Sequence, residues 1–157
     1  MISTVLVERP WLSPALLAVI VAAGVLAGPW LVPRRRLTWV LAAASLLPVV
    51  ALTLVPVDRE LFARCTVQWA LPTPGRVELM ANVVLFAAPV LLAGVATRRP
   101  LVALLVGSGA SVLVEAFQAA VPAIGRSCDT NDWLANTIGA ALGAAVAWVA
   151  LRRAQRV

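Results

Sequence analysis

The chain has 157 residues, a length that allows one domain, and 62% of them are hydrophobic. Only 13% are charged and the mean hydropathy is +0.94, so the composition excludes an ordinary soluble domain and indicates an integral membrane protein. The net charge of +6 is carried by arginines, and the chain has no histidine, which excludes imidazole catalysis and histidine–metal sites.

Long apolar runs divide the chain into five predicted transmembrane helices. A helix needs about 20 apolar residues to cross the hydrocarbon core, because it rises about 1.5 Å per residue. The predicted spans are about 11–33, 37–57, 79–97, 101–121 and 133–151, with a polar segment at 58–78. No basic region precedes the first span, so we expect a retained helix and not a cleaved signal peptide. The pattern predicts an all-α bundle that forms a single membrane domain over residues 1–157.

The arginines predict the orientation of this bundle. Eight of them border the same set of loop ends: Arg34, Arg35, Arg36, Arg98, Arg99, Arg152, Arg153 and Arg156. The other set holds five, together with every acidic residue except Glu115. The positive-inside rule places the first set in the cytoplasm, which predicts an outside N-terminus and a cytoplasmic C-terminus. Because the arginines stand at the ends of apolar runs and form no basic face, the lipid bilayer is the expected partner and nucleic acid is not.

Polar side chains on three predicted helices meet at the outer end of this arrangement. Two sets fall at helical spacing on one face each: Glu78 and Asn82, and Ser111, Glu115 and Gln118. Asp129 and Asp132 stand just before the fifth span, and Asn136 lies one turn inside it. An ionisable group inside a membrane requires a partner, and Arg126 is the predicted partner of Glu115. Three helices that bring polar residues to one depth indicate a ligand-binding site, and a purely structural hydrogen-bond network is the alternative.

These residues also carry a resemblance to a known family. The three blocks that carry it are Glu78-x-x-x-Asn82 with Phe86 and Pro89, Glu115-x-x-Gln118, and Arg126-x-x-Asp129-x-x-Asp132-x-x-x-Asn136-x-x-Gly139-x-x-x-Gly143. Over roughly residues 37–151 the chain resembles the VanZ-like family. The resemblance implies a small multi-pass protein of the bacterial cytoplasmic membrane and cell envelope. The founding member of the family is associated with low-level teicoplanin resistance, but the family brings no settled reaction. The loop that carries Cys65 does not match the family pattern.

Three further features have two interpretations each. Cys65 and Cys128 both fall on the predicted outer side, where they form either a disulfide or two separate thiols. Gly139 and Gly143 allow close helix packing, either inside the bundle or in a homodimer through the fifth helix. The carboxylates of Asp129 and Asp132 are weak candidates for a Mg²⁺ or Ca²⁺ site, or simply negative charge at a helix start. No firm metal site and no cofactor are expected.

The residues support three functional hypotheses. In the first, the outer polar site binds a lipid-linked envelope precursor or a glycopeptide: Arg126 meets phosphate or carboxylate, and the amides of Asn82, Gln118 and Asn136 meet sugar or peptide groups. In the second, the chain is a membrane enzyme acting on a lipid-linked phosphate or glycan. Glu115 is then the candidate catalytic acid or base, and Asp129 and Asp132 position a metal or water. In the third, the polar residues only lock the helices together.

Overall fold

The computed structural model describes residues 8–59 and 62–156, which leaves two residues of the predicted polar segment 58–78 outside the description. Five helices are long and apolar enough to cross a membrane. They are α2 (Leu12–Leu31), α3 (Arg35–Thr53), α4 (Val77–Thr97), α5 (Pro100–Ala120) and α6 (Thr130–Ala154). A 3₁₀ turn, η1 (Pro122–Ile124), and two short strands, β1 (Cys65–Thr66) and β2 (Cys128–Asp129), complete the described elements. The prediction of five membrane helices is confirmed.

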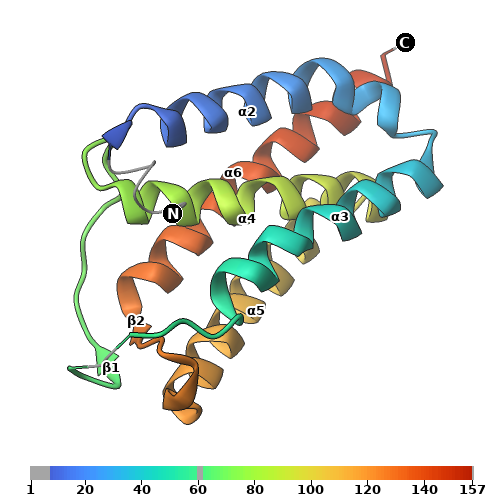
Figure 1. Ribbon diagram of the computed structural model, residues 1–157. Coiled ribbons are helices and arrows are strands. Elements are labelled where there is room, and N and C mark those ends of the chain that lie inside the picture. Colours follow the sequence, from blue (N-terminus) through green and yellow to red (C-terminus); the bar gives the residue numbers. More distant parts are fainter. Residues whose placement is uncertain (1–7, 60–61, 157) are drawn as a thin grey trace.

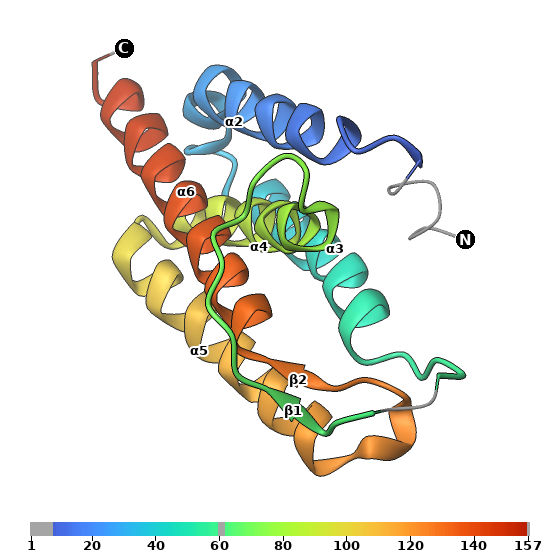
Figure 2. The same ribbon diagram turned by 90° about the vertical axis from the view of Figure 1, so that its left-hand side faces the viewer.

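Helix α4 lies at the centre of the bundle and contacts each of the other four helices. Helix α6 crosses α4 obliquely and, like α4, begins at the end of the bundle where β1 and β2 lie, while α5 runs back in the opposite sense (Figures 1 and 2). Three small clusters of buried apolar residues line these contacts. Two of them, around Val83 and around Val95, lie between α4 and α6 and are also covered by α2.

The closest approach between helices is that of α6 to α4. A Cβ atom added at Gly139 would collide with the backbone carbonyl of Val83, and one added at Gly143 would collide with that of Ala87. Only glycine allows two helix backbones to approach to this distance. Gly139 and Gly143, which we call the glycine ridge of α6, therefore pack inside the bundle, against α4 of the same chain.

The outer faces of the bundle are apolar, as a hydrocarbon solvent requires. Large side chains on α2, α3 and α5 stand out from the structure; Leu26, Leu47 and Leu105 are 75%, 70% and 72% exposed. In water such a surface would be an aggregation liability, but lipid tails are as apolar as leucine. The three peripheral helices thus present their apolar faces to lipid.

Among the helix ends that differ from the predicted bounds, two are explained by local contacts. Helix α3 ends at Thr53 and not near 57, because Pro56 disfavours helical backbone in the residue before it and Val57 N–H donates to Ile124 O at 2.9 Å. Helix α6 begins three residues before the apolar run, since the Asp129 side chain accepts a hydrogen bond from Asn131 N–H and so caps the helix. Local polar contacts decided both ends.

The bundle has two chemically different ends. We call one the arginine end: the α2–α3 and α4–α5 connections and the C-terminal end of α6 lie there (Figure 1). At this end Arg153 Nη1 donates to Val25 O at 3.3 Å, which ties α6 to α2. The opposite end, the disulfide end, holds β1, β2, η1 and the beginnings of α4 and α6 (Figure 2). The candidate site lies at the disulfide end.

Candidate functional site

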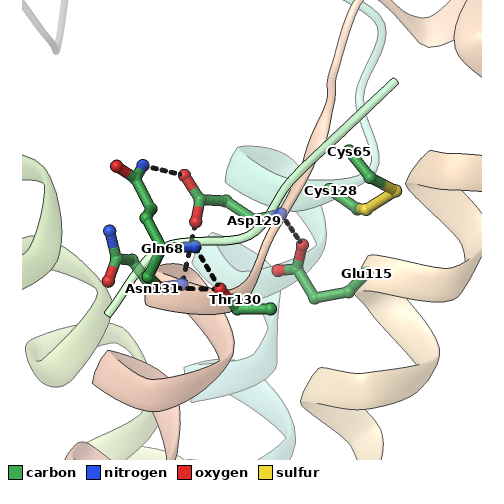
Figure 3. The surroundings of a disulfide bond; sticks show 7 residues. All are labelled: Cys65, Gln68, Glu115, Cys128, Asp129, Thr130 and Asn131. Carbon is green, nitrogen blue, oxygen red and sulfur yellow. Dashed lines mark hydrogen bonds between the residues drawn. A yellow bond between two sulfur atoms is a disulfide. The ribbon is translucent and has the colours of Figure 1, made fainter. Parts of the chain in front are cut away.

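Two segments that are distant in the sequence are clamped side by side at the disulfide end. Strands β1 and β2 pair in parallel, with Cys65 opposite Cys128. These two cysteines form a disulfide with a Cα–Cα distance of 4.5 Å, and Cys128 N–H donates to Arg64 O at 2.9 Å. Of the two interpretations of the cysteines, the structure contains the disulfide (Figure 3).

Hydrogen bonds beyond the disulfide extend this clamp to the start of α6 (Figure 3). Gln68 N–H donates to Thr130 Oγ1 at 2.9 Å, and Thr130 Oγ1 donates to Gln68 O at 2.7 Å. Gln68 Nε2 also donates to Asp129 Oδ2 at 2.7 Å, and Ala70 N–H donates to Asn131 Oδ1 at 2.7 Å. The long loop before α4 is therefore fixed to the first residues of α6. Sequence reasoning missed Gln68, Thr130 and Asn131 as parts of the site.

Glu115, near the end of α5, contributes to the same clamp. Its Oε2 accepts a hydrogen bond from Asp129 N–H at 2.7 Å (Figure 3). The predicted ion pair with Arg126 is wrong, because Arg126 Nε donates instead to Val55 O at 3.1 Å. The preceding residue, Gly125, has a φ of 69° and packs against the backbone of the segment after α3. Burial lowers the pKa of Arg126, yet an arginine remains charged at neutral pH.

Gln118 is a buried side chain that ties α5 to the end of α3. Its Nε2 donates to Thr53 O at 3.0 Å. Thr53 is the last residue of α3, where the backbone carbonyls of a helix lose their intrahelical partners. Gln118 thus supplies a donor that the end of α3 requires. Seven residues share such a role, and we call them the locking group: Gln68, Glu115, Gln118, Arg126, Asp129, Thr130 and Asn131.

The remaining predicted site residues lie where α4 and α6 begin. Each helix presents an acid and, one turn later, an amide: Glu78 and Asn82 on α4, and Asp132 and Asn136 on α6. Asp132 lies beside the amide of Asn82 and within the electrostatic influence of Glu78 and Asp129. We call these four residues, two from each helix, the open group.

Asn136 is the most deeply placed member of the open group, with only 2% of its surface exposed. Its Nδ2 donates to Ser111 Oγ at 2.8 Å, but Oδ1 has no hydrogen-bond partner among the described residues. Nearby in sequence, the buried indole Nε1 of Trp133 likewise has none there. A buried polar atom left unpaired costs about 1–3 kcal/mol, so a bound ligand group or water is expected at such atoms.

The immediate surroundings of Glu115 and Asp132 are acidic. The charged groups that act on Glu115 are the carboxylates of Asp129 and Asp132, and those that act on Asp132 are the carboxylates of Asp129 and Glu78. Within residues 8–59 and 62–156, no three Asp, Glu, His or Cys side chains are grouped so that they could hold a metal ion. The weak metal candidates Asp129 and Asp132 therefore gain no third ligand of these types from the described chain. What the arrangement offers is hydrogen-bond acceptors and negative charge.

Comparison with known proteins supports the resemblance seen in the sequence. A family model described as VanZ/LLP1 matches residues 15–151, which includes most or all of each of the five helices and both the locking and the open groups. The match therefore begins within α2, earlier than the predicted start near residue 37. No curated protein and no solved structure matches the chain. Because the family model covers most of the sequence, the chain belongs to the VanZ/LLP1 family.

Proposed function

We propose that this protein binds the polar headgroup of a lipid-linked envelope precursor or of a glycopeptide, through the open group at the disulfide end. The observation that carries the proposal is Asn136: its Oδ1 is buried and unpaired within the described chain, one helical turn from Asp132. In the locking group, by contrast, Gln118 Nε2 and Asn131 Oδ1 are hydrogen-bonded, and neither side chain has a buried atom without a partner among the described residues. A ligand that donates a hydrogen bond supplies what Asn136 lacks.

The proposal includes a place for this site in the cell. The eight arginines of the arginine end support, through the positive-inside rule, a protein in the bacterial cytoplasmic membrane with that end in the cytoplasm. The disulfide end then faces outward, with the N-terminus outside and the C-terminus inside. The bond between Cys65 and Cys128 supports this orientation, because disulfides persist in oxidising compartments.

The acidic character of the open group selects the kind of headgroup. Carboxylates and amide oxygens accept hydrogen bonds from hydroxyl, amide and ammonium groups, and they repel phosphate. Arg126, which would have met a phosphate, donates to Val55 O instead. The sugar or peptide part of a lipid-linked precursor, or a glycopeptide of the teicoplanin type, therefore fits this end better than a lipid phosphate. A link to teicoplanin resistance is part of the proposal and rests on the family alone.

The matched pair Asn136→Leu and Gln118→Leu tests the proposal. We expect Asn136→Leu to keep the stability of the native protein within about 1 kcal/mol, because removing the unpaired buried acceptor Oδ1 offsets the loss of the hydrogen bond from Nδ2 to Ser111 Oγ. Gln118→Leu leaves the Thr53 carbonyl without its hydrogen-bond donor and should lower the stability by about 1–3 kcal/mol. Binding of teicoplanin and of a polyprenyl-linked muropeptide, measured by native mass spectrometry in detergent, should be lost in Asn136→Leu and retained in folded Gln118→Leu.

The opposite result supports the structural hypothesis. If Asn136→Leu unfolds as readily as Gln118→Leu and neither probe binds the unmodified protein, the open group is a further part of the lock. The enzymatic alternative, with Glu115 as acid or base, requires Glu115→Gln to bind a probe normally and fail to convert it. The geometry favours binding over this alternative, since Glu115 already holds the backbone of Asp129.

A further inference from the structure

A groove opens on the side of the bundle at the arginine end, far from the candidate site. It has a volume of about 650 Å³ and lies between the first half of α5 and the last half of α6. Leu101, Leu104, Ala141, Ala145 and Trp148 are among the residues that line it, and Arg99 lies at its edge. Almost all of its surface is apolar. The groove belongs to neither the locking group nor the open group.

This groove continues into a basic hollow through Trp148, which borders both. The hollow, of about 350 Å³, is lined by Arg152, Arg153 and Arg156 as well as by Trp148. The guanidinium of Arg152 lies 5.0 Å from the centre of the Trp148 ring. The apolar groove thus leads to the basic hollow, and the half-exposed Trp148 lies where the two meet.

The sequence leaves this cluster without opposing charge. No acidic residue occurs between Glu78 and Glu115, nor anywhere after Asp132, so neither the α4–α5 connection nor the end of α6 carries one. Four arginines border the groove and the hollow: Arg99, Arg152, Arg153 and Arg156. Basic sites between membrane helices bind anionic lipid headgroups, and each basic residue near the surface contributes about 1 kcal/mol.

We propose that the groove and the hollow together bind one anionic phospholipid, with an acyl chain along α5 and α6 and the headgroup phosphate among the arginines. The tryptophan has the position that its amphipathic ring prefers, at the boundary between hydrocarbon and headgroups. The charge also distinguishes this occupant from a second copy of the chain. A copy docked in the same orientation would bring a second arginine end against the first, and like charges repel.

The experiment is a lipid titration by native mass spectrometry of the full chain in detergent. Phosphatidylglycerol and phosphatidylcholine with identical acyl chains are the two probes, so only the headgroup charge differs. Since about 1 kcal/mol corresponds to about a fivefold change in affinity, we expect Arg152→Gln with Arg156→Gln to weaken phosphatidylglycerol binding about 25-fold. Phosphatidylcholine binding should change little. Arg35→Gln with Arg36→Gln removes the same charge at the same end, outside the groove, and should have a much smaller effect.

A second variant tests the apolar part of the site. Ala145 is exposed and lines the groove, so Ala145→Leu fills it without disturbing the core and should weaken both lipids at least fivefold. Ala110→Leu, at an exposed position of α5 outside the groove, is the matched control and should leave both lipids unchanged. Equal affinity for the two headgroups, or equal loss in the Arg35 and Arg36 variant, would overturn the proposal. So would an Ala145→Leu variant that loses a dimer while it retains its lipid.

Discussion

The contact between α4 and α6 gives the sharpest test of the fold, because two glycines of one chain should respond to the same substitution in opposite ways. A Cβ at Gly139 would collide with Val83 O and approach the Val83 carbonyl carbon and Cα to 2.9 Å. The obstacle is backbone, which has no rotamer to change. A Cβ at Gly109, on the exposed face of α5, meets nothing within 4 Å. Gly139→Ala is therefore the test substitution and Gly109→Ala its control.

The magnitudes follow from two opposing terms. Alanine favours a helix interior by about 1 kcal/mol over glycine, and this gain applies to both positions. Overpacking typically costs about 1–3 kcal/mol, and a backbone obstacle places Gly139→Ala near the upper value. We expect Gly139→Ala to lower the free energy of unfolding by about 2 kcal/mol and Gly109→Ala to raise it by up to about 1 kcal/mol.

Equilibrium unfolding in mixed micelles, with SDS as the denaturant and circular dichroism as the signal, measures both effects in one solvent. The difference between the two variants, about 3 kcal/mol, depends on the close approach of α6 to α4 and on little else. If Gly139→Ala is as stable as Gly109→Ala, α6 does not pack against α4 at Val83, and the assignment of the glycine ridge to the interior of the bundle is refuted.

Other predictions concern the disulfide end. Replacing Cys65 and Cys128 with serine removes a crosslink that spans 63 residues. This should lower the unfolding free energy by at most about 4 kcal/mol, and by less if α4 and α5 stay helical in the unfolded chain; unchanged stability under oxidising conditions would contradict it. In the same titration, Gln118→Leu should lower the unfolding free energy by about 1–3 kcal/mol. Gln118→Glu keeps the shape of the side chain but also loses the donor to Thr53 O, so it should be no more stable than Gln118→Leu. Trp133→Phe removes an indole N–H that has no partner in the described chain, so its stability should stay within about 1 kcal/mol of the native value.

The helices were predictable because a membrane leaves the backbone little choice. In hydrocarbon every N–H and C=O must be paired within the segment, so an apolar run of sufficient length forms a helix whatever its neighbours are. Two predicted helix bounds were wrong because polar contacts, and not lipid, surround the chain there. Val57 pairs with Ile124 after the end of α3, and Asp129 caps the start of α6.

The end of the bundle at which the candidate residues lie was also predictable, since the order of the helices and loops fixes it. Their partners were not. The sequence pattern paired Glu115 with Arg126 by charge, but Arg126 Nε donates to Val55 O, and the backbone N–H of Asp129 donates to the glutamate. Gln68 had no motif to mark it, because its role arises only when β1 lies beside β2.

The sequence by itself determined that this chain is a five-helix membrane protein with VanZ-like blocks and chemically different ends, because hydropathy, spacing and charge are properties of single segments. Only the tertiary structure distinguishes the locking group, whose side chains hydrogen-bond to distant segments of the chain, from the open group around Asp132 and Asn136. That division depends on which atoms of distant segments come within about 3 Å of one another, and directional hydrogen bonds over such distances are decided by packing in three dimensions.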